Sequence, residues 1–140
     1  MTLVLAATGC GGGKLSHSDY VKRADAVCKA YAGATKPLTH PRSYADVIAY
    51  VKQTLPLYEA ALRKLRALEP PSNDAAAVRT WLAADRRVAG AIRALGVAAQ
   101  RRDFPAVSAA ASRAQLAGSA SRRSAASLGM QVCARIASGR

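Results

Sequence analysis

Several residue classes and patterns are scarce in this 140-residue chain. Aromatic residues make up 5% of it, with one Trp and one Phe, so we expect a core built mainly from aliphatic side chains. No apolar stretch approaches the roughly 20 residues that span a bilayer, which argues against an integral membrane protein. No strand-like alternation of apolar and polar residues competes with helical spacing. These absences favour a small helical domain.

Patterns that signal enzymatic chemistry are also absent. The chain has no Gly-x-Ser-x-Gly segment, no Cys-x-x-Cys pair and no glycine-rich phosphate loop after a strand. Its 8 acidic residues are scattered, without an obvious carboxylate pair for acid–base chemistry. His17 and His40 lie in predicted loops without a partner four residues away, so we interpret them as surface residues. We therefore expect no enzymatic activity, no catalytic residue, no metal ion and no dissociable cofactor.

Basic residues, in contrast, are abundant. Lys and Arg number 21, and the formal net charge is +13. An excess of Arg and Ala is typical of a high-GC genome; the functional alternative is attraction to anionic lipid, cell-wall polymer or nucleic acid. Nucleic acid is disfavoured, because Tyr31, Tyr58 and Trp81, which could stack on bases, are predicted to lie in the core. We expect the arginines to face solvent, anionic lipid or wall polymer.

Apolar residues recur at helical spacing in four segments. Ser18 is a suitable N-cap for the first, which Gly33 and the following prolines end, and Ser43 starts the second. Short connections between four amphipathic helices predict an all-α, up-down-up-down four-helix bundle. Pro56 lies inside the second segment and removes a backbone hydrogen bond, so we expect a kink near Pro56 or two helical pieces. The third and fourth predicted helices cover about 74–101 and 103–128, with Gly129 ending the last.

The amino terminus contains a short apolar run that ends in small residues directly before Cys10, followed by Gly11–Gly13. This pattern resembles the bacterial lipobox, in which a signal peptide is cut before a Cys that carries diacylglycerol and acyl lipid. The resemblance implies lipidation of Cys10 and a lipid anchor at the extracytoplasmic face of the cell membrane. The alternative is an apolar terminus that contains Cys10 incidentally. The predicted regions are a signal-peptide remnant (1–9), the lipidated Cys with a flexible tether (10–17) and the bundle domain (18–140).

The number of cysteines is consistent with export. If Cys10 is acylated, Cys28 and Cys133 remain as a pair, and export places them in an oxidising compartment. A disulfide between them would stabilise the fold by about 4–5 kcal/mol in the chain-entropy model, an upper figure. A zinc site is a poorer interpretation, because no His stands at ligand spacing from either Cys.

Three short segments together resemble a group of small exported all-helical proteins from high-GC Gram-positive bacteria. They are Ala24–Cys28 (ADAVC), Leu65–Pro71 (LRALEPP) and the late Cys133. The resemblance implies a disulfide-linked helical domain. That group has no agreed activity, so the resemblance assigns no catalytic residues.

One acidic residue, Asp85, lies on the apolar stripe of the third predicted helix, one turn from Trp81. The groove around these two residues is the candidate ligand site; the alternative is a carboxylate at the bundle edge that pairs with an arginine.

The sequence as a whole predicts a non-catalytic, membrane-anchored exported lipoprotein with a helical binding or scaffolding domain. Two alternatives stay open: a soluble secreted ligand-binding bundle, and a basic cytosolic bundle that binds nucleic acid.

Overall fold

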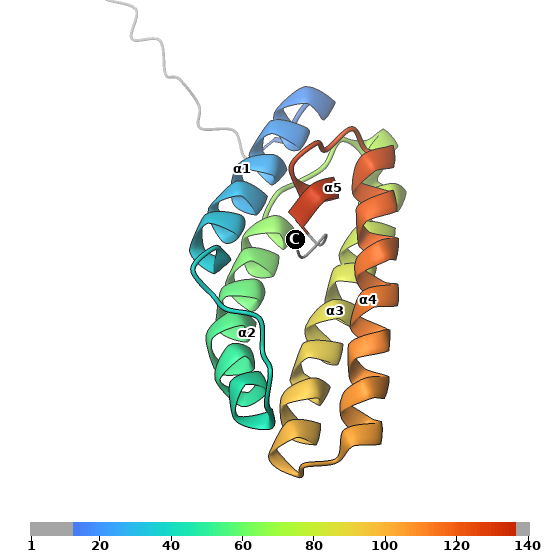
Figure 1. The fold of residues 1–140 in the computed structure, drawn as a ribbon. Coiled ribbons are helices and arrows are strands. Elements are labelled where there is room, and N and C mark those ends of the chain that lie inside the picture. The colour runs from blue at the N-terminus through green and yellow to red at the C-terminus, as the bar shows by residue number, and fades with distance from the viewer. Residues whose placement is uncertain (1–12, 137–140) are drawn as a thin grey trace, which may run out of the picture.

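A computed structural model describes residues 13–136, and its regular structure in this range is entirely helical (Figure 1). Four long helices pack together, so the all-α prediction is confirmed. The predicted signal-peptide remnant and Cys10 lie outside the described residues. The elements are α1 (His17–Thr35), α2 (Tyr44–Arg66), the 3-10 turn η1 (Ser72–Asp74), α3 (Ala75–Gln100), α4 (Phe104–Ser127) and α5 (Cys133–Ile136).

Three of the long helices begin at a side chain that accepts a hydrogen bond from the backbone amide three residues on. Ser43 caps α2 and Asp103 caps α4, so both helices begin where the sequence predicts. The prediction for α1 was wrong by two residues, since Ser16 rather than Ser18 is the N-cap. Ser16 also donates to the carboxylate of Asp19, and these reciprocal bonds favour the earlier start.

The two glycines that the sequence places at helix ends behave differently. Gly33 lies inside α1, which continues to Thr35, so it does not end the helix. Gly129 has a φ of +82°, a backbone conformation that other residues rarely adopt, and it follows the last turn of α4. This turn redirects the chain toward α5 and Cys133.

Pro56 is accommodated within α2, which is one continuous helix from Tyr44 to Arg66. The prediction of two helical pieces is therefore wrong. Val51 and Leu62, on either side of Pro56, are both buried, and this packing holds the two halves of α2 in one helix despite the missing hydrogen bond.

The helices that are adjacent in the chain also pack against each other: α1 on α2, α2 on α3, and α3 on α4. The α3–α4 contact is built largely from small buried residues, such as Ala99 and Ala110, which let the two helices approach closely. Gly96 has the same role between α3 and α2, since a Cβ built there would lie 2.9 Å from Cγ1 of Val51.

Between α1 and α4 the arrangement is different. Figure 1 shows α5 lying between these two helices, and α5 packs against both. The largest fully buried side chains near α5 are Tyr20, Trp81 and Met130, each at most 1% exposed. We call this region, from α1 through α5 to the end of α4, the closed end of the domain.

Residues just before α1 also contact the domain. The backbone amide of Leu15 donates to the carbonyl of Glu69 at 3.1 Å, and Nζ of Lys14 lies 2.8 Å from Oγ of Ser72. His17 is the first residue of α1, and its Nδ1 lies 2.6 Å from a carboxylate oxygen of Asp74. The packed part of the chain therefore includes residues that the sequence assigns to the tether or to a loop.

Candidate functional site

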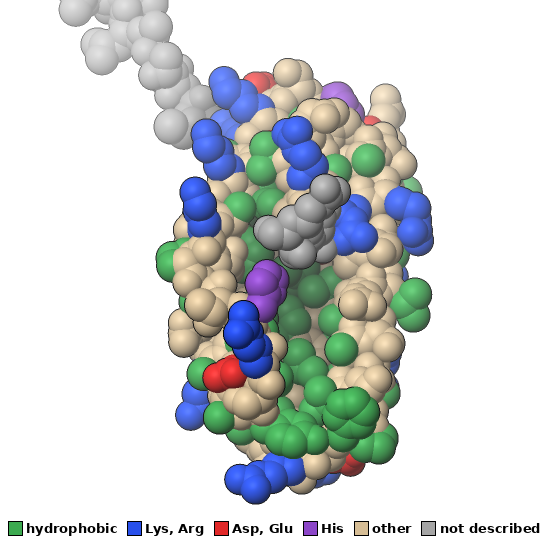
Figure 2. All heavy atoms as spheres, in the orientation of Figure 1, with side chains coloured by type: hydrophobic (Ala, Val, Ile, Leu, Met, Phe, Trp, Pro, Cys, Tyr) green, Lys and Arg blue, Asp and Glu red, His purple; other side chains and the backbone are tan. Residues whose placement is uncertain are grey.

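A cavity of about 700 Å³ lies among the helices, and residues from α1, α2, α3, α4 and α5 all contribute to its wall. Figure 2 shows this face hollowed between the helices, with hydrophobic side chains in the hollow and Lys and Arg side chains around it. The volume falls in the range of pockets that hold small organic ligands. Its lining includes both residues of the predicted groove, Trp81 and Asp85.

Aromatic side chains form part of the cavity wall. The rings of Tyr31 on α1 and Tyr58 on α2 meet edge to face, with centroids 5.4 Å apart and an interplanar angle of 83°. Tyr50 and Trp81 also line the cavity. The sequence places Tyr31 and Tyr58 in the core, whereas both are only half-buried here.

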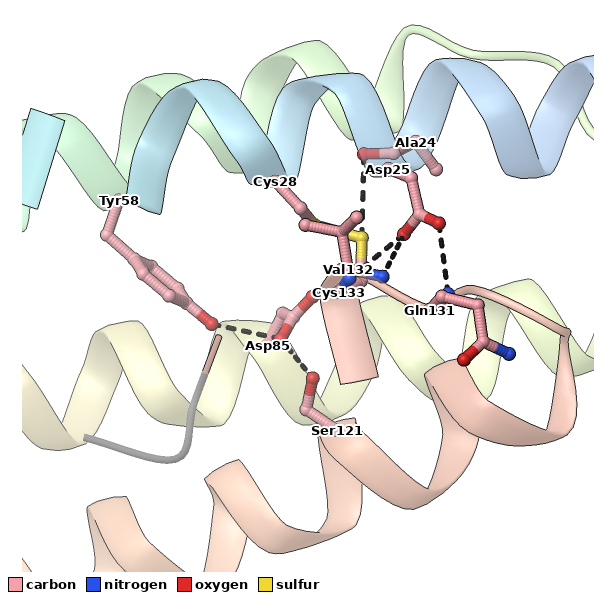
Figure 3. Close-up of a disulfide and its surroundings, with 9 residues drawn as sticks. All are labelled: Ala24, Asp25, Cys28, Tyr58, Asp85, Ser121, Gln131, Val132 and Cys133. Carbon is pink, nitrogen blue, oxygen red and sulfur yellow. Dashed lines mark hydrogen bonds between the residues drawn. A yellow bond between two sulfur atoms is a disulfide. The ribbon is translucent and has the colours of Figure 1, made fainter. Parts of the chain in front are cut away.

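Asp85 on α3 is the acidic group of the cavity, and it is 7% exposed. Its Oδ1 accepts hydrogen bonds from the hydroxyl of Tyr58 at 2.9 Å and from the hydroxyl of Ser121 at 2.6 Å. Figure 3 shows these two side chains pointing toward Asp85 from α2 and α4. Three long helices therefore meet at one carboxylate.

The arginine partner expected for Asp85 is not what the structure shows. The ion pairs between described residues are His17–Asp74 and Arg93–Glu59, and neither contains Asp85. The neighbouring helices α2 and α4 contribute the hydroxyls of Tyr58 and Ser121 to Asp85, rather than an arginine. The prediction of an arginine pair was therefore wrong.

Burial controls the protonation of this cluster. It raises the pKa of Asp85 above the ordinary value of 3.8, and the hydrogen bonds from Ser121 and Tyr58 offset part of that rise. Burial also raises the pKa of the Tyr58 hydroxyl, and the charge of Asp85 and the hydrogen bond to it raise it further. Tyr58 therefore stays protonated and donates its hydrogen to Asp85.

Thr54 on α2 adds a polar atom without a partner. It lines the cavity one helical turn before Tyr58, on the same face of α2, and is 2% exposed. Its hydroxyl oxygen is one of two buried side-chain polar atoms in residues 13–136 that make no hydrogen bond; the other is the Tyr20 hydroxyl. Buried polar groups are nearly always paired, so the Thr54 hydroxyl is an exception among the described residues.

The predicted disulfide is present. Cys28 on α1 and Cys133 on α5 are joined, with their Cα atoms 5.3 Å apart, and both line the cavity next to the closed end. Asp25, one turn before Cys28, accepts hydrogen bonds from the backbone amides of Gln131, Val132 and Cys133 at 2.9–3.0 Å (Figure 3). The disulfide and this carboxylate together hold α5 against α1.

Sequence reasoning missed Thr54, Ser121 and Asp25. Thr54 and Ser121 are short polar residues on otherwise apolar or small-residue helix faces, a signal that helical spacing alone could have provided. For Asp25 the only hint was its place within ADAVC, since the amides it binds are more than a hundred residues away in the chain.

The basic clusters lie mostly on the surface, as the sequence predicts. Arg63, Arg86, Arg101 and Arg123 are exposed, whereas Arg122 is half-buried, lines the cavity and donates to the hydroxyl of Ser119 at 2.9 Å. Within residues 13–136, no helix is long and apolar enough to cross a membrane, and no His, Cys, Asp or Glu side chains form a group of three that could hold a metal ion.

Comparison of the chain with protein-family models, with curated proteins and with solved structures found no match.

Proposed function

We propose that this chain is a non-catalytic binding protein that is exported, anchored by lipid at Cys10, and takes a small, largely apolar ligand into the cavity between its helices. The observation that carries the proposal is the cavity itself, about 700 Å³ with aromatic walls and one buried carboxylate. Ligand sites are typically concave and apolar, with a few polar groups that orient the ligand. We also propose that the four long helices form an up-down-up-down bundle in which α2 bends near Pro56.

Two observations support export and anchoring. Stable disulfides form in oxidising compartments, and Cys28 and Cys133 are joined in the structure. The pattern around Cys10 resembles a lipobox, and Gly11–Gly13 would act as a flexible spacer between the lipid and the domain. The anchor would then hold the cavity at the extracytoplasmic surface, where the basic surface could contact anionic lipid or wall polymer.

Binding can be tested with the neutral apolar dye N-phenyl-naphthylamine, whose emission rises in apolar surroundings. We expect saturable binding of one dye per chain, with a change in the fluorescence of Trp81, the chain's single Trp. Ala114→Phe should weaken binding because Ala114 lines the cavity, whereas Ala109→Phe, at an exposed position of the same helix, should leave it unchanged. Absence of saturable binding, or equal effects of the two variants, would refute a cavity site.

Anchoring can be tested by the intact mass of the protein purified from its native membrane, with and without reductant. We expect the mass of an acylated chain that begins at Cys10, and an increase by two hydrogen atoms on reduction. A chain recovered from the cytosol without lipid, and with all three thiols free, would contradict export. A secreted but unacylated chain would favour the soluble ligand-binding alternative.

A further inference from the structure

We infer that the cavity selects ligands that carry a positively charged amino group on an apolar body, with the amino group bound at Asp85. This inference rests on the proposed function, since it requires that the cavity takes a ligand at all. It adds the chemical class of that ligand and the residues that recognise it.

The first argument concerns the charge of Asp85. Its Oδ1 accepts both hydroxyl hydrogen bonds, and Oδ2 accepts none from the described residues. Oδ2 is also not among the buried unpaired atoms, so it retains contact with the cavity that Asp85 lines. Burial of an isolated charge is costly, so burial favours the protonated acid when Asp85 has no cationic partner, and a bound cation would stabilise the carboxylate. An ammonium group would supply both the opposite charge and the missing donor.

The second argument concerns the groups around that carboxylate. An ammonium group has three hydrogens to donate, and Oδ2 of Asp85 is an acceptor that the described residues leave without a donor. The rings of Tyr31 and Tyr50, which also line the cavity, can attract a cation through their quadrupoles. The aliphatic part of the wall can cover an apolar body; it includes Leu62, Val88, Ile92 and Leu95.

The cavity also contains a basic residue, and this defines the rival ligand class. Arg122, which directly follows Ser121 in α4, lines the wall and donates to the hydroxyl of Ser119. A ligand with a carboxylate would bind near Arg122 instead of Asp85. The experiment therefore has to compare a cation, a neutral molecule and an anion that share one apolar body.

We propose to measure the binding of octylammonium, octanol and octanoate to the full chain at neutral pH and 0.15 M salt, by calorimetry and Trp81 fluorescence. At that salt the Debye length is about 8 Å, so the overall charge of +13 is largely screened. We expect octylammonium to bind about tenfold more tightly than octanol, because a charge-assisted hydrogen bond exceeds a neutral one by roughly that factor. Octanoate should bind more weakly than either.

Two variants with the same change in charge sharpen the test. Asp85→Asn should abolish the preference for octylammonium over octanol while octanol still binds. Asp19→Asn, at the exposed start of α1, should keep the preference. Equal binding of all three probes to the wild-type protein, or a preference for octanoate, would overturn the inferred ligand class and leave the cavity site intact. Binding of none of them would overturn both, and these wild-type results do not depend on how the variants fold.

Discussion

The closed end and the cavity of this domain use an aspartate in opposite ways. At the closed end, Asp25 is near the surface of α1 and its two carboxylate oxygens accept three backbone amides that precede or begin α5. In the cavity, Asp85 is buried, and a single oxygen accepts two hydroxyl hydrogens. Both oxygens of Asp25 accept hydrogen bonds and hold α5 against α1, whereas Oδ2 of Asp85 accepts none from residues 13–136.

The packing around the two aspartates also differs. At the closed end, α5 fills the space between α1 and α4, and Tyr20, Trp81 and Met130 are fully buried there. Farther along the helices, none of the elements within residues 13–136 takes the place of α5, and the side chains of Tyr31 and Tyr58 stay half-buried. The comparison shows that the short helix α5, which the disulfide joins to α1, fills the core at the closed end, whereas the rest of the space between the helices is a partly polar cavity.

The largest expected effect on stability comes from removing the Cys28–Cys133 disulfide. Replacing both Cys28 and Cys133 with Ser should lower the free energy of unfolding by about 2–5 kcal/mol, because the disulfide closes a long loop of the unfolded chain. The sequence separation of the two cysteines is 105. Urea unfolding of the variant measures the loss, and the wild-type protein in reductant is the control. Equal stability with and without the bond would mean that packing alone seals this end.

A smaller loss of stability is expected when the Asp25 carboxylate, which also holds α5 against α1, is removed. Asp25→Ala leaves the amides of Gln131, Val132 and Cys133 without their acceptor, which should cost about 1–3 kcal/mol. Hydrogen exchange at these amides should become faster, while exchange in α3 changes little. Asp25→Asn keeps one acceptor oxygen and should lose less. Unchanged protection of the three amides would show that the disulfide suffices to hold α5.

Two tyrosine hydroxyls permit a matched comparison of the two regions. Tyr58→Phe removes a donor to buried Asp85 and should destabilise the protein by about 1–2 kcal/mol. Tyr20→Phe removes a buried hydroxyl that has no partner, which should leave stability unchanged or raise it by up to about 1 kcal/mol. Thermal unfolding of both variants checks the prediction. Equal losses would indicate that the Tyr20 hydroxyl is hydrogen-bonded in solution.

The smallest expected effect is a dependence of stability on pH that arises in the cavity. Folding raises the pKa of Asp85 above 3.8, so between the two pKa values the folded protein binds more protons than the unfolded chain. The contribution of Asp85 to stability is therefore greatest below pH 3.8 and decreases as pH rises through the folded pKa. Chemical unfolding at a series of pH values should show this decrease in the wild-type protein and not in Asp85→Asn. Parallel profiles would assign the pH dependence to other groups.

Local signals in the sequence were sufficient to predict most of the secondary structure. The second and fourth long helices begin at Ser43 and Asp103, as predicted, and Gly129 ends α4 through its positive φ. The errors at Ser18 and Gly33 arose where two neighbouring residues could serve the same purpose, or where a glycine is tolerated within a helix. The anchor at Cys10 stays a prediction, since it lies outside the described residues.

The number and type of the long helices, and the pairing of Cys28 with Cys133, followed from the sequence by itself, because apolar periodicity, caps and the count of thiols are local or arithmetic properties. Only the tertiary structure decided that Tyr58 and Ser121, rather than an arginine, surround Asp85, and that a cavity persists beside them. Those outcomes depend on the distances between helices that are remote in the chain. A short helix and one carboxylate set those distances at the closed end, and no local pattern encodes them.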